Sequence, residues 1–294
     1  MSRTRTGEDC SERDVVMEER RVVVAGRGLV EAPRWHDGRL YFSDWTAGEI
    51  VAADLAGHTE VVARVRSLPL CSAWLPDGRL LIVASGDGRL LRREPDGSLV
   101  THAELGGPGW NDIVVDGRGN AYVNSVGYDM ATGEPERPGH IVLATADGPV
   151  RRVAEGLAFP NGMAVTADNA TLVVAESHGP RLTAFDVGGD GGLTGGRVFA
   201  DLDEAPDGIC LDAEGAVWYA TVPSRRCVRV ADGGRVLETV ELDRGGFACV
   251  LGGPDRRTLF ATVAEWRPDL PELVPAGSGQ VQAARVAVPG AGWP

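Results

Sequence analysis

The sequence contains no lysine, because all 29 basic residues are arginine. This excludes a Schiff-base mechanism, which needs a lysine amine, and a P-loop, which needs a phosphate-binding lysine. Basic residues are also outnumbered: 42 acidic residues give a formal net charge of −13. Nucleic acids and anionic lipids bind basic surfaces, so neither nucleic acid nor a membrane is expected as a partner.

Cysteines and long apolar runs are scarce as well. The five cysteines are dispersed without a C-x-x-C pair, which argues against a disulfide framework or a zinc-thiolate site. They are typical of reduced, buried thiols, and we expect a cytoplasmic protein. No apolar run approaches the roughly 20 residues that span a bilayer. Residues 1–19 are charged and lack a signal-peptide core, so we expect a disordered tail before one domain over residues 20–294.

Glycine is abundant, with 40 residues, and much of it follows aspartate. Pairs such as Asp37-Gly38, Asp77-Gly78 and Asp232-Gly233 separate short runs rich in Val, Leu, Ile and Tyr. Short apolar runs bounded by Asp-Gly turns predict β-hairpins. No segment of comparable length shows helical spacing, so the sequence predicts an all-β fold.

These hairpins recur with a regular period. The opening residues of successive units are 40 to 50 positions apart, and they are Glu31, Cys71, Asn111, Asn161, Asp207 and Phe247. Six units of about four strands predict a six-bladed β-propeller, whereas the alternative of a double-sheet sandwich does not explain the period. The last unit is short. We therefore expect its strand over residues 280–286 to pair with an N-terminal strand near residues 21–25 and close the ring.

The six opening residues should converge, because the first strand of each propeller blade lines the central channel. Four of them carry oxygen, namely Glu31, Asn111, Asn161 and Asp207. Carboxylates that meet near a low-dielectric channel repel each other and lose solvation, and a divalent cation would offset that cost. Oxygen donors favour Ca²⁺, Mg²⁺ or Mn²⁺ over a structural Zn²⁺. In a simpler interpretation, Asn161-Gly162 and Asp207-Gly208 are ordinary turn pairs.

Four segments resemble the SMP-30/gluconolactonase/luciferin-regenerating-enzyme family, which includes regucalcin. They are EAPRW from Glu31, NDIVVD from Asn111, PNGM from Pro160 and PDGICLDAEGAVW from Pro206. The likeness extends over about residues 22–288, and the last segment is the most specific. The first segment departs slightly, because the family usually has glycine where Ala32 stands.

This resemblance implies a six-bladed propeller with one divalent metal ion in the channel, held by Glu31, Asn161 and Asp207. Ca²⁺ is the first expectation for that ion, with Mg²⁺, Mn²⁺ and Zn²⁺ as alternatives. The resemblance also implies substrate contacts by Asn111 and Asp129.

The gluconolactonases of the family carry an arginine that grips sugar hydroxyls two residues before the position of Asn111. Here that position is Gly109, and Trp110 follows it. We expect Trp110 to contribute an aromatic wall to the substrate pocket. The replacement of that arginine by Gly109 indicates a ligand less polar than a sugar lactone.

The chemistry that the family implies is hydrolysis of a cyclic ester, so the expected partner is a small-molecule substrate, a lactone. A metal ion would stabilise the developing oxyanion, and Asp207 would orient or deprotonate the attacking water. One alternative is a non-hydrolytic, metal-dependent isomerase or cyclase acting on a specialised metabolite. Another is a non-enzymatic calcium-binding or interaction propeller, although a pure scaffold could fill its channel with apolar side chains.

Overall fold

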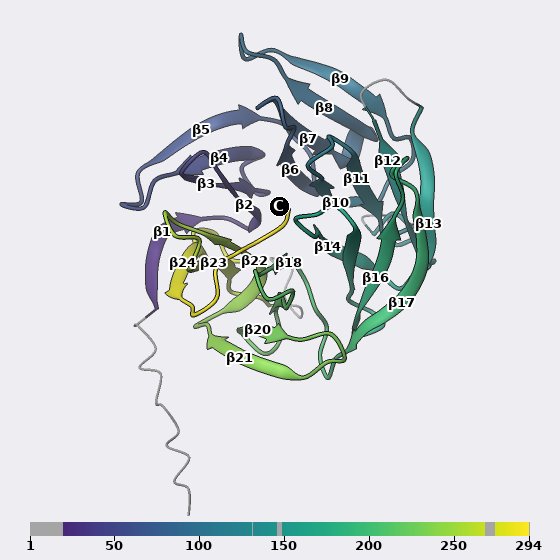
Figure 1. The fold of residues 1–294 in the computed structure, drawn as a ribbon. Helices are drawn as coiled ribbons and strands as arrows, with labels where there is room; N and C mark the ends of the chain where they lie inside the picture. Colours follow the sequence, from purple (N-terminus) through teal and green to yellow (C-terminus); the bar gives the residue numbers. More distant parts are fainter. Residues whose placement is uncertain (1–19, 131, 146–148, 268–273, 294) are drawn as a thin grey trace, which may run out of the picture.

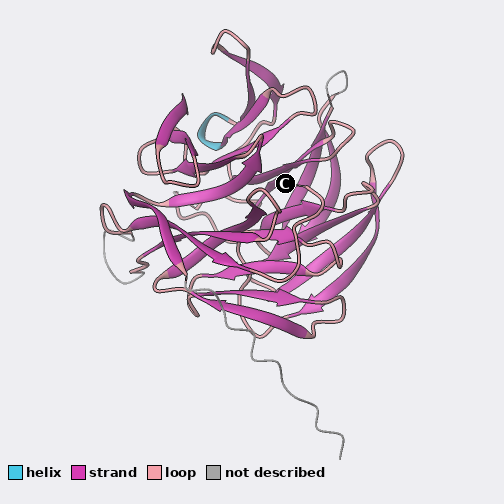
Figure 2. Ribbon diagram, turned by 60° about the vertical axis from the view of Figure 1, so that its left-hand side comes forward, coloured by secondary structure: helices cyan, strands magenta, loops and turns pink. Residues whose placement is uncertain are grey.

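The computed structural model describes residues 20–130, 132–145, 149–267 and 274–293, and the expected tail over residues 1–19 lies outside them. The described chain is built of 24 strands and one short 3₁₀ helix, η1 (Ser85–Asp87), as Figure 2 shows. The prediction of an all-β fold is confirmed. Within the described part of the chain, no helix is long and apolar enough to cross a membrane.

Six antiparallel sheets of four strands surround a common axis, which confirms the six-bladed propeller (Figure 1). Blade 1 contains β2 (Val30–His36), β3 (Arg39–Asp44), β4 (Glu49–Ala53) and β5 (Thr59–Arg64). Blade 2 contains β6 (Leu70–Trp74), β7 (Leu80–Ala84), β8 (Arg89–Arg93) and β9 (Leu99–Glu104). Blade 3 contains β10 (Trp110–Val115), β11 (Ala121–Ser125), β12 (Gly139–Ala144) and β13 (Arg151–Leu157).

The remaining three blades follow the same order from the axis outward. Blade 4 contains β14 (Pro160–Val165), β15 (Thr171–Glu176), β16 (Arg181–Val187) and β17 (Leu193–Asp201). Blade 5 contains β18 (Ile209–Leu211), β19 (Val217–Thr221), β20 (Arg226–Val230) and β21 (Val236–Glu241). Blade 6 contains β22 (Gly245–Gly252), β23 (Thr258–Ala264), β24 (Gly279–Arg285) and, as its outer strand, β1 (Arg21–Arg27).

Ring closure comes from β1, which pairs antiparallel with β24 in a register that sets Arg21 opposite Ala283. The N-terminal strand thus completes the last blade, as the short sixth unit of the sequence predicts. Closure in this way leaves no interruption between the first blade and the last one.

Aspartate side chains hold the turns between the strands. In blade 3, Oδ1 of Asp116 accepts backbone N–H groups from Arg118 and Asn120, both at 2.9 Å. In blade 5, Oδ1 of Asp212 accepts the corresponding groups of Glu214 at 2.8 Å and Ala216 at 3.1 Å. An aspartate that caps its own turn in this way fixes the hairpin locally, so the strand order follows from short-range chemistry.

The core lies between blades rather than inside any one of them. The described residues form six hydrophobic clusters, and each cluster fills one of the six interfaces between neighbouring blades. Strands such as β7 and β19 are buried along their whole length because both of their faces pack against a neighbouring blade. This explains why the apolar runs of the sequence are continuous and not alternating.

The C-terminal segment, residues 286–293, crosses the end of the channel where the first strands finish; we call it the C-terminal strap. Figure 1 shows the chain end near the axis. Trp293 exchanges two backbone hydrogen bonds with Val165 of blade 4, both at 2.8 Å. The strap also accepts from Ala213 of blade 5 and donates to Arg256 of blade 6, each at 2.8 Å. Three blades are therefore joined by a segment that the repeat does not predict.

Replacing Gly292 in the strap should destabilise the propeller. Gly292 has a φ of +71°, and an added Cβ would overlap the carbonyl oxygen of Val165. Gly215 is a matched control, because its φ is +77° and an added Cβ would meet open space. Left-handed strain alone costs about 1 kcal/mol, and overpacking adds about 1–3 kcal/mol. Guanidinium unfolding should therefore show a clearly larger loss for Gly292→Ala than for Gly215→Ala. Equal losses would mean that the strap adds no stability.

Candidate metal and active site

The predicted opening residues occupy equivalent places in the six blades. Glu31, Cys71, Asn111 and Asn161 are each the second residue of the first strand of a blade. Phe247 is the third residue of β22, and Asp207 precedes β18 by two residues. The repeat period of the sequence therefore places these side chains at one end of the channel, which we call the mouth.

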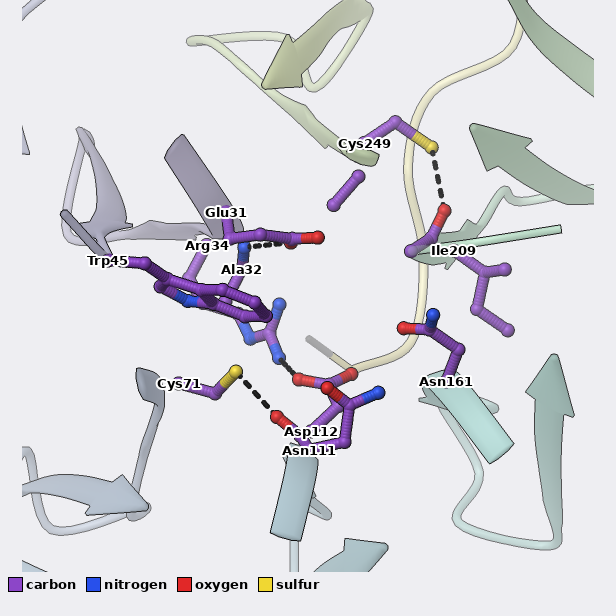
Figure 3. Close-up of a pocket in the computed structure, with 12 residues that line it drawn as sticks. Glu31, Ala32, Arg34, Trp45, Cys71, Asn111, Asp112, Asn161, Ile209 and Cys249 are labelled. Atoms are coloured by element: carbon purple, nitrogen blue, oxygen red, sulfur yellow. Dashed lines mark hydrogen bonds and ion pairs between the residues drawn. The ribbon is translucent and has the colours of Figure 1, made fainter. Parts of the chain in front are cut away.

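Four of these residues line one small enclosed cavity at the mouth. Its volume is about 10 Å³, which is enough for a single water-sized sphere. Figure 3 shows Glu31 and Asn161 pointing into the same space from different blades. The lining residues are Glu31, Ala32, Arg34, Trp45, Cys71, Asn111, Asp112, Asn161, Gly208, Ile209, Ala248 and Cys249. The cavity can hold one ion but not an organic substrate.

The Glu31 carboxylate is held by its own backbone neighbour. Oε2 of Glu31 accepts the N–H of Ala32 at 2.6 Å, and Ala32 has a φ of +47°. This left-handed conformation suits glycine better than alanine, which explains why a glycine is usual at this position. Burial raises the pKa of Glu31, and the Asp112 carboxylate raises it further, while the Ala32 N–H and the Arg34 charge oppose the rise.

Asp207 does not line the cavity itself, but it interacts with two residues that do. Burial raises the pKa of Asp207 well above its usual range, and the Glu31 carboxylate is the next largest cause. The side-chain amide of Asn161 and the backbone N–H of Gly208 hydrogen-bond to its carboxylate and oppose the rise. Asp207 is therefore electrostatically coupled to Glu31 and hydrogen-bonded to Asn161.

A short hydrogen-bond chain orients Asn161. Its Nδ2 donates to Oγ of Ser177 at 3.3 Å, and that hydroxyl donates to the carbonyl oxygen of Pro206 at 2.7 Å. With Nδ2 engaged, Oδ1 is the atom of Asn161 that can face a cation. Ser177 was not among the sequence-predicted site residues, and it links blade 4 to the residue before Asp207.

The two glycines at the ring are required for close packing. Asn161-Gly162 lies inside strand β14, so the turn interpretation of that pair is wrong, whereas Asp207-Gly208 forms a bend before β18. Gly162 lies inside β14, and an added Cβ would come within 2.5 Å of the Ile209 nitrogen. An added Cβ at Gly208 would overlap the Ala248 methyl group. Neither glycine has a positive φ. They allow the first strands of blades 4, 5 and 6 to approach one another near the axis.

A buried ion pair, missed by the sequence reasoning, also lines the cavity. Nη2 of Arg34 donates to Oδ1 of Asp112 at 2.8 Å and to the carbonyl oxygen of Ile113 at 2.7 Å. The other carboxylate oxygen of Asp112 accepts the backbone N–H of Met163 at 3.2 Å. Asn124 accepts the N–H of Asp112 at 3.1 Å and donates to the carbonyl oxygen of Asn161 at 2.5 Å.

β-bulges explain why Arg34 and Asp112 reach the cavity. The pairing of the first strand with the second shifts between Glu31 and Arg34, between Trp110 and Ile113, and at the equivalent places in blades 4 and 6. A regular strand would turn Asn111 and Asp112 to opposite faces, but a bulge re-aims one of them. The only sequence signal is that Asp112 follows an opening residue directly.

Breaking this ion pair should cost stability. Arg34→Leu leaves the buried Asp112 carboxylate without its guanidinium, and loss of one partner of a buried pair costs about 3–5 kcal/mol. The double variant Arg34→Leu/Asp112→Asn removes both charges and should recover much of that loss. Unfolding by guanidinium in the presence of EDTA measures the free energy of unfolding of the single and double variants. A double variant that loses as much as the two single variants added together would contradict the pairing.

Two predicted substrate contacts lie away from the cavity. Trp110 is buried, and its indole N–H donates to the carbonyl oxygens of Gly106 at 2.7 Å and Gly107 at 3.0 Å. It lines a separate depression of about 570 Å³ between blades 2 and 3. Asp129 follows β11 at the mouth, where its carbonyl oxygen accepts the Thr132 hydroxyl at 3.2 Å. Neither side chain lines the cavity.

The donor set fits a hard cation. Among the described residues no group of three or more His, Cys, Asp and Glu is placed to hold a metal ion, and the cavity is lined by the carboxylates Glu31 and Asp112 together with the amides Asn111 and Asn161. Burial raises the pKa of the Cys71 and Cys249 thiols well above their usual range, so these sulfurs are not thiolate ligands. Carboxylate and amide oxygens around an ion-sized cavity match the preferences of Ca²⁺ and Mg²⁺.

Known proteins resemble this chain in sequence and in fold. Residues 29–265 match the SMP-30/Gluconolactonase/LRE-like region. Regucalcin from Xenopus laevis is 26% identical over 262 residues, covering 82% of this chain and 87% of that protein. A 6-deoxy-6-sulfogluconolactonase from Pseudomonas putida is 27% identical over 162 residues, covering 53% of this chain and 56% of that enzyme. The crystal structure of a calcium-binding protein, regucalcin from Agrobacterium tumefaciens, superposes with a TM-score of 0.78 at 23% identity, covering 95% of this chain and 97% of that one.

Proposed function

We propose that this chain, which belongs to the SMP-30/gluconolactonase/LRE-like family, is a divalent-metal-dependent hydrolase that opens a lactone or a related cyclic ester. The observation that carries the proposal is the ion-sized cavity at the propeller mouth, lined by carboxylate and amide oxygens. The sulfogluconolactonase among the relatives supports the choice of a lactone as substrate.

Glu31, Asn161 and Asp207 would hold the ion, and Ca²⁺ is the first candidate because all three offer oxygen atoms. The calcium-binding regucalcin with the same fold supports this choice. When bound, a divalent cation supplies Lewis-acid polarisation of the ester carbonyl. The charge of the ion would also offset the repulsion between the carboxylates of Glu31 and Asp207. Without the ion, burying these two charges together is unfavourable.

The chain's own residues would perform the remaining steps. Asp207 orients the attacking water and accepts its proton, and the side-chain amide of Asn111 hydrogen-bonds the substrate. Water adds to the carbonyl carbon, the ring C–O bond breaks, the leaving ring oxygen takes back the proton held by Asp207, and the product is the open hydroxy acid. Proton release from that acid gives a direct assay at constant pH.

Metal binding should be visible without any substrate. After dialysis against EDTA, addition of Ca²⁺ should raise the melting temperature, since 100-fold excess over Kd stabilises a protein by about 2.7 kcal/mol. Asp207→Asn should abolish most of this shift. Asp203→Asn is the matched control, because Asp203 is exposed in the same loop. Mg²⁺, Mn²⁺ and Zn²⁺ in parallel identify the preferred ion. An unchanged melting temperature with all four ions would exclude the metal site.

Hydrolysis itself is tested with a panel of γ- and δ-lactones and base consumption as the readout. Asp207→Asn should lower kcat by at least about 100-fold, the scale associated with general-base catalysis, while Asp203→Asn retains the wild-type rate. Near-normal turnover by Asp207→Asn would remove Asp207 from the mechanism. Metal binding without acid release from any lactone would instead favour the isomerase or cyclase alternative.

A further inference from the structure

Large apolar side chains gather at the mouth. Among the described residues, most exposed large hydrophobic side chains lie on outer strands or on the C-terminal strap. The three exceptions are in segments that border the mouth: Leu68 is 65% exposed before β6, Met130 is 47% exposed after β11, and Trp266 is 40% exposed after β23. These three side chains border the mouth from blades 2, 3 and 6.

Aromatic side chains connect this surface to the axis. Trp45 lines the ion-sized cavity itself. Phe159 directly precedes β14, and its ring packs 4.4 Å from His178 and 6.3 Å from Tyr128. Trp266 packs edge-on at 5.9 Å against Phe247, the opening residue of blade 6. We call the following set the apolar collar: Trp45, Leu68, Tyr128, Met130, Phe159 and Trp266.

Several polar groups near the collar are already engaged. The Trp45 indole N–H donates to the carbonyl oxygen of Leu70 at 2.6 Å, so the indole can offer only its apolar surface to a ligand. Two charged pairs at the mouth neutralise each other, Arg137 with Glu134 and Arg267 with Glu265, both at 2.5 Å. A ligand with many hydroxyl groups would have to compete with these contacts for the same donors.

Position 109 cannot supply a donor either. Gly109 has a φ of +86°, and an added Cβ would lie 2.6 Å from the carbonyl oxygen of Tyr128. Any side chain at this position would therefore require a different backbone conformation. The absence of a side chain at position 109 is a property of the local chain path and not of one substitution alone.

We propose that the substrate is a lactone with an apolar alkyl or aryl substituent, which packs on the apolar collar while its ester group faces the ion-sized cavity. This rests on the proposed hydrolase function. A cavity of about 10 Å³ has room for one ion or one water-sized group, so the substituent of the lactone must lie outside it, against the collar. Burial of the substituent there supplies binding energy, and the polar ester is the only part that needs oxygen or nitrogen partners.

Matched lactones test the substrate class with Ca²⁺-loaded protein. δ-Decalactone differs from δ-valerolactone only by a pentyl substituent, and its kcat/KM should be at least about tenfold higher, well within what burial of the pentyl group provides. Glucono-δ-lactone should be the poorest of the three. If glucono-δ-lactone is preferred, or if the pentyl group gives no gain, the apolar assignment is wrong and the hydrolase function stands.

A variant pair locates the effect on the collar. Trp266→Ala should lower the ratio of kcat/KM for δ-decalactone over δ-valerolactone by about tenfold, because the substituent loses an aromatic contact. Val236→Ala is the control, since Val236 is 59% exposed but lies on the outer strand β21. Its ratio should match that of the wild type. Equal ratios for all three proteins would exclude the collar as the determinant.

A binding measurement keeps the two proposals separable. 2-Pentylcyclopentanone carries the same substituent on a ketone that cannot be hydrolysed, and calorimetry should give it at least about tenfold tighter binding than cyclopentanone. Trp266→Ala should remove that preference. Absence of the preference overturns the collar proposal even if lactones are hydrolysed. If the pentyl ketone still binds more tightly than cyclopentanone but no lactone is hydrolysed, only the hydrolase function is overturned.

Discussion

The repulsion between buried carboxylates at the propeller mouth is the constraint on which the rest of the structure depends. Glu31 and Asp207 come from blades 1 and 5, and the Glu31 carboxylate raises the pKa of Asp207, while the Asp112 carboxylate raises the pKa of both. Asp112 adds a third carboxylate, and Arg34 is the guanidinium paired with it. Three negative charges and one positive charge leave a formal charge of −2, which a single divalent cation would offset. The same acids without an ion carry a desolvation penalty of several kcal/mol each, which the six hydrophobic interfaces between blades have to outweigh.

The repeat period was sufficient to predict the architecture, because each level of the fold follows from a local signal. Asp-Gly turns fix the hairpins, and the spacing of the opening residues assigns six blades. The short last unit requires β1 to complete it. Glu31, Asn111 and Asn161 hold the same position in their repeat units, and equivalent residues of a propeller lie at one distance from the axis. These three side chains therefore meet at one cavity.

The remaining features escaped prediction for physical reasons that can be named. Period-2 alternation assigns one face to each residue, so it cannot anticipate the bulges that turn Asp112 toward the cavity. Ser177 orients Asn161 across blades, and no local pattern predicts a contact of that kind. The C-terminal strap belongs to no repeat unit, and its hydrogen bonds to the blades join residues 29 or more positions apart. Trp110 lies in the segment predicted to contact substrate, but its indole N–H already donates to the backbone carbonyl oxygens of Gly106 and Gly107.

The proposed chemistry and the proposed choice of substrate rest on different parts of the chain. The oxygen donors of the ring lie on or beside first strands that are packed on both sides, where glycines such as Gly208 leave no room for displacement. The collar side chains lie in connecting segments, which tolerate change because fewer contacts depend on them. Trp45 is the exception, since it lines the ion-sized cavity and also belongs to the collar. Because its N–H is fixed on Leu70 of the next blade, the indole is held rigidly where the reacting ester and its substituent would meet. A rigid apolar contact at that junction can favour one orientation of the substrate without any additional polar group.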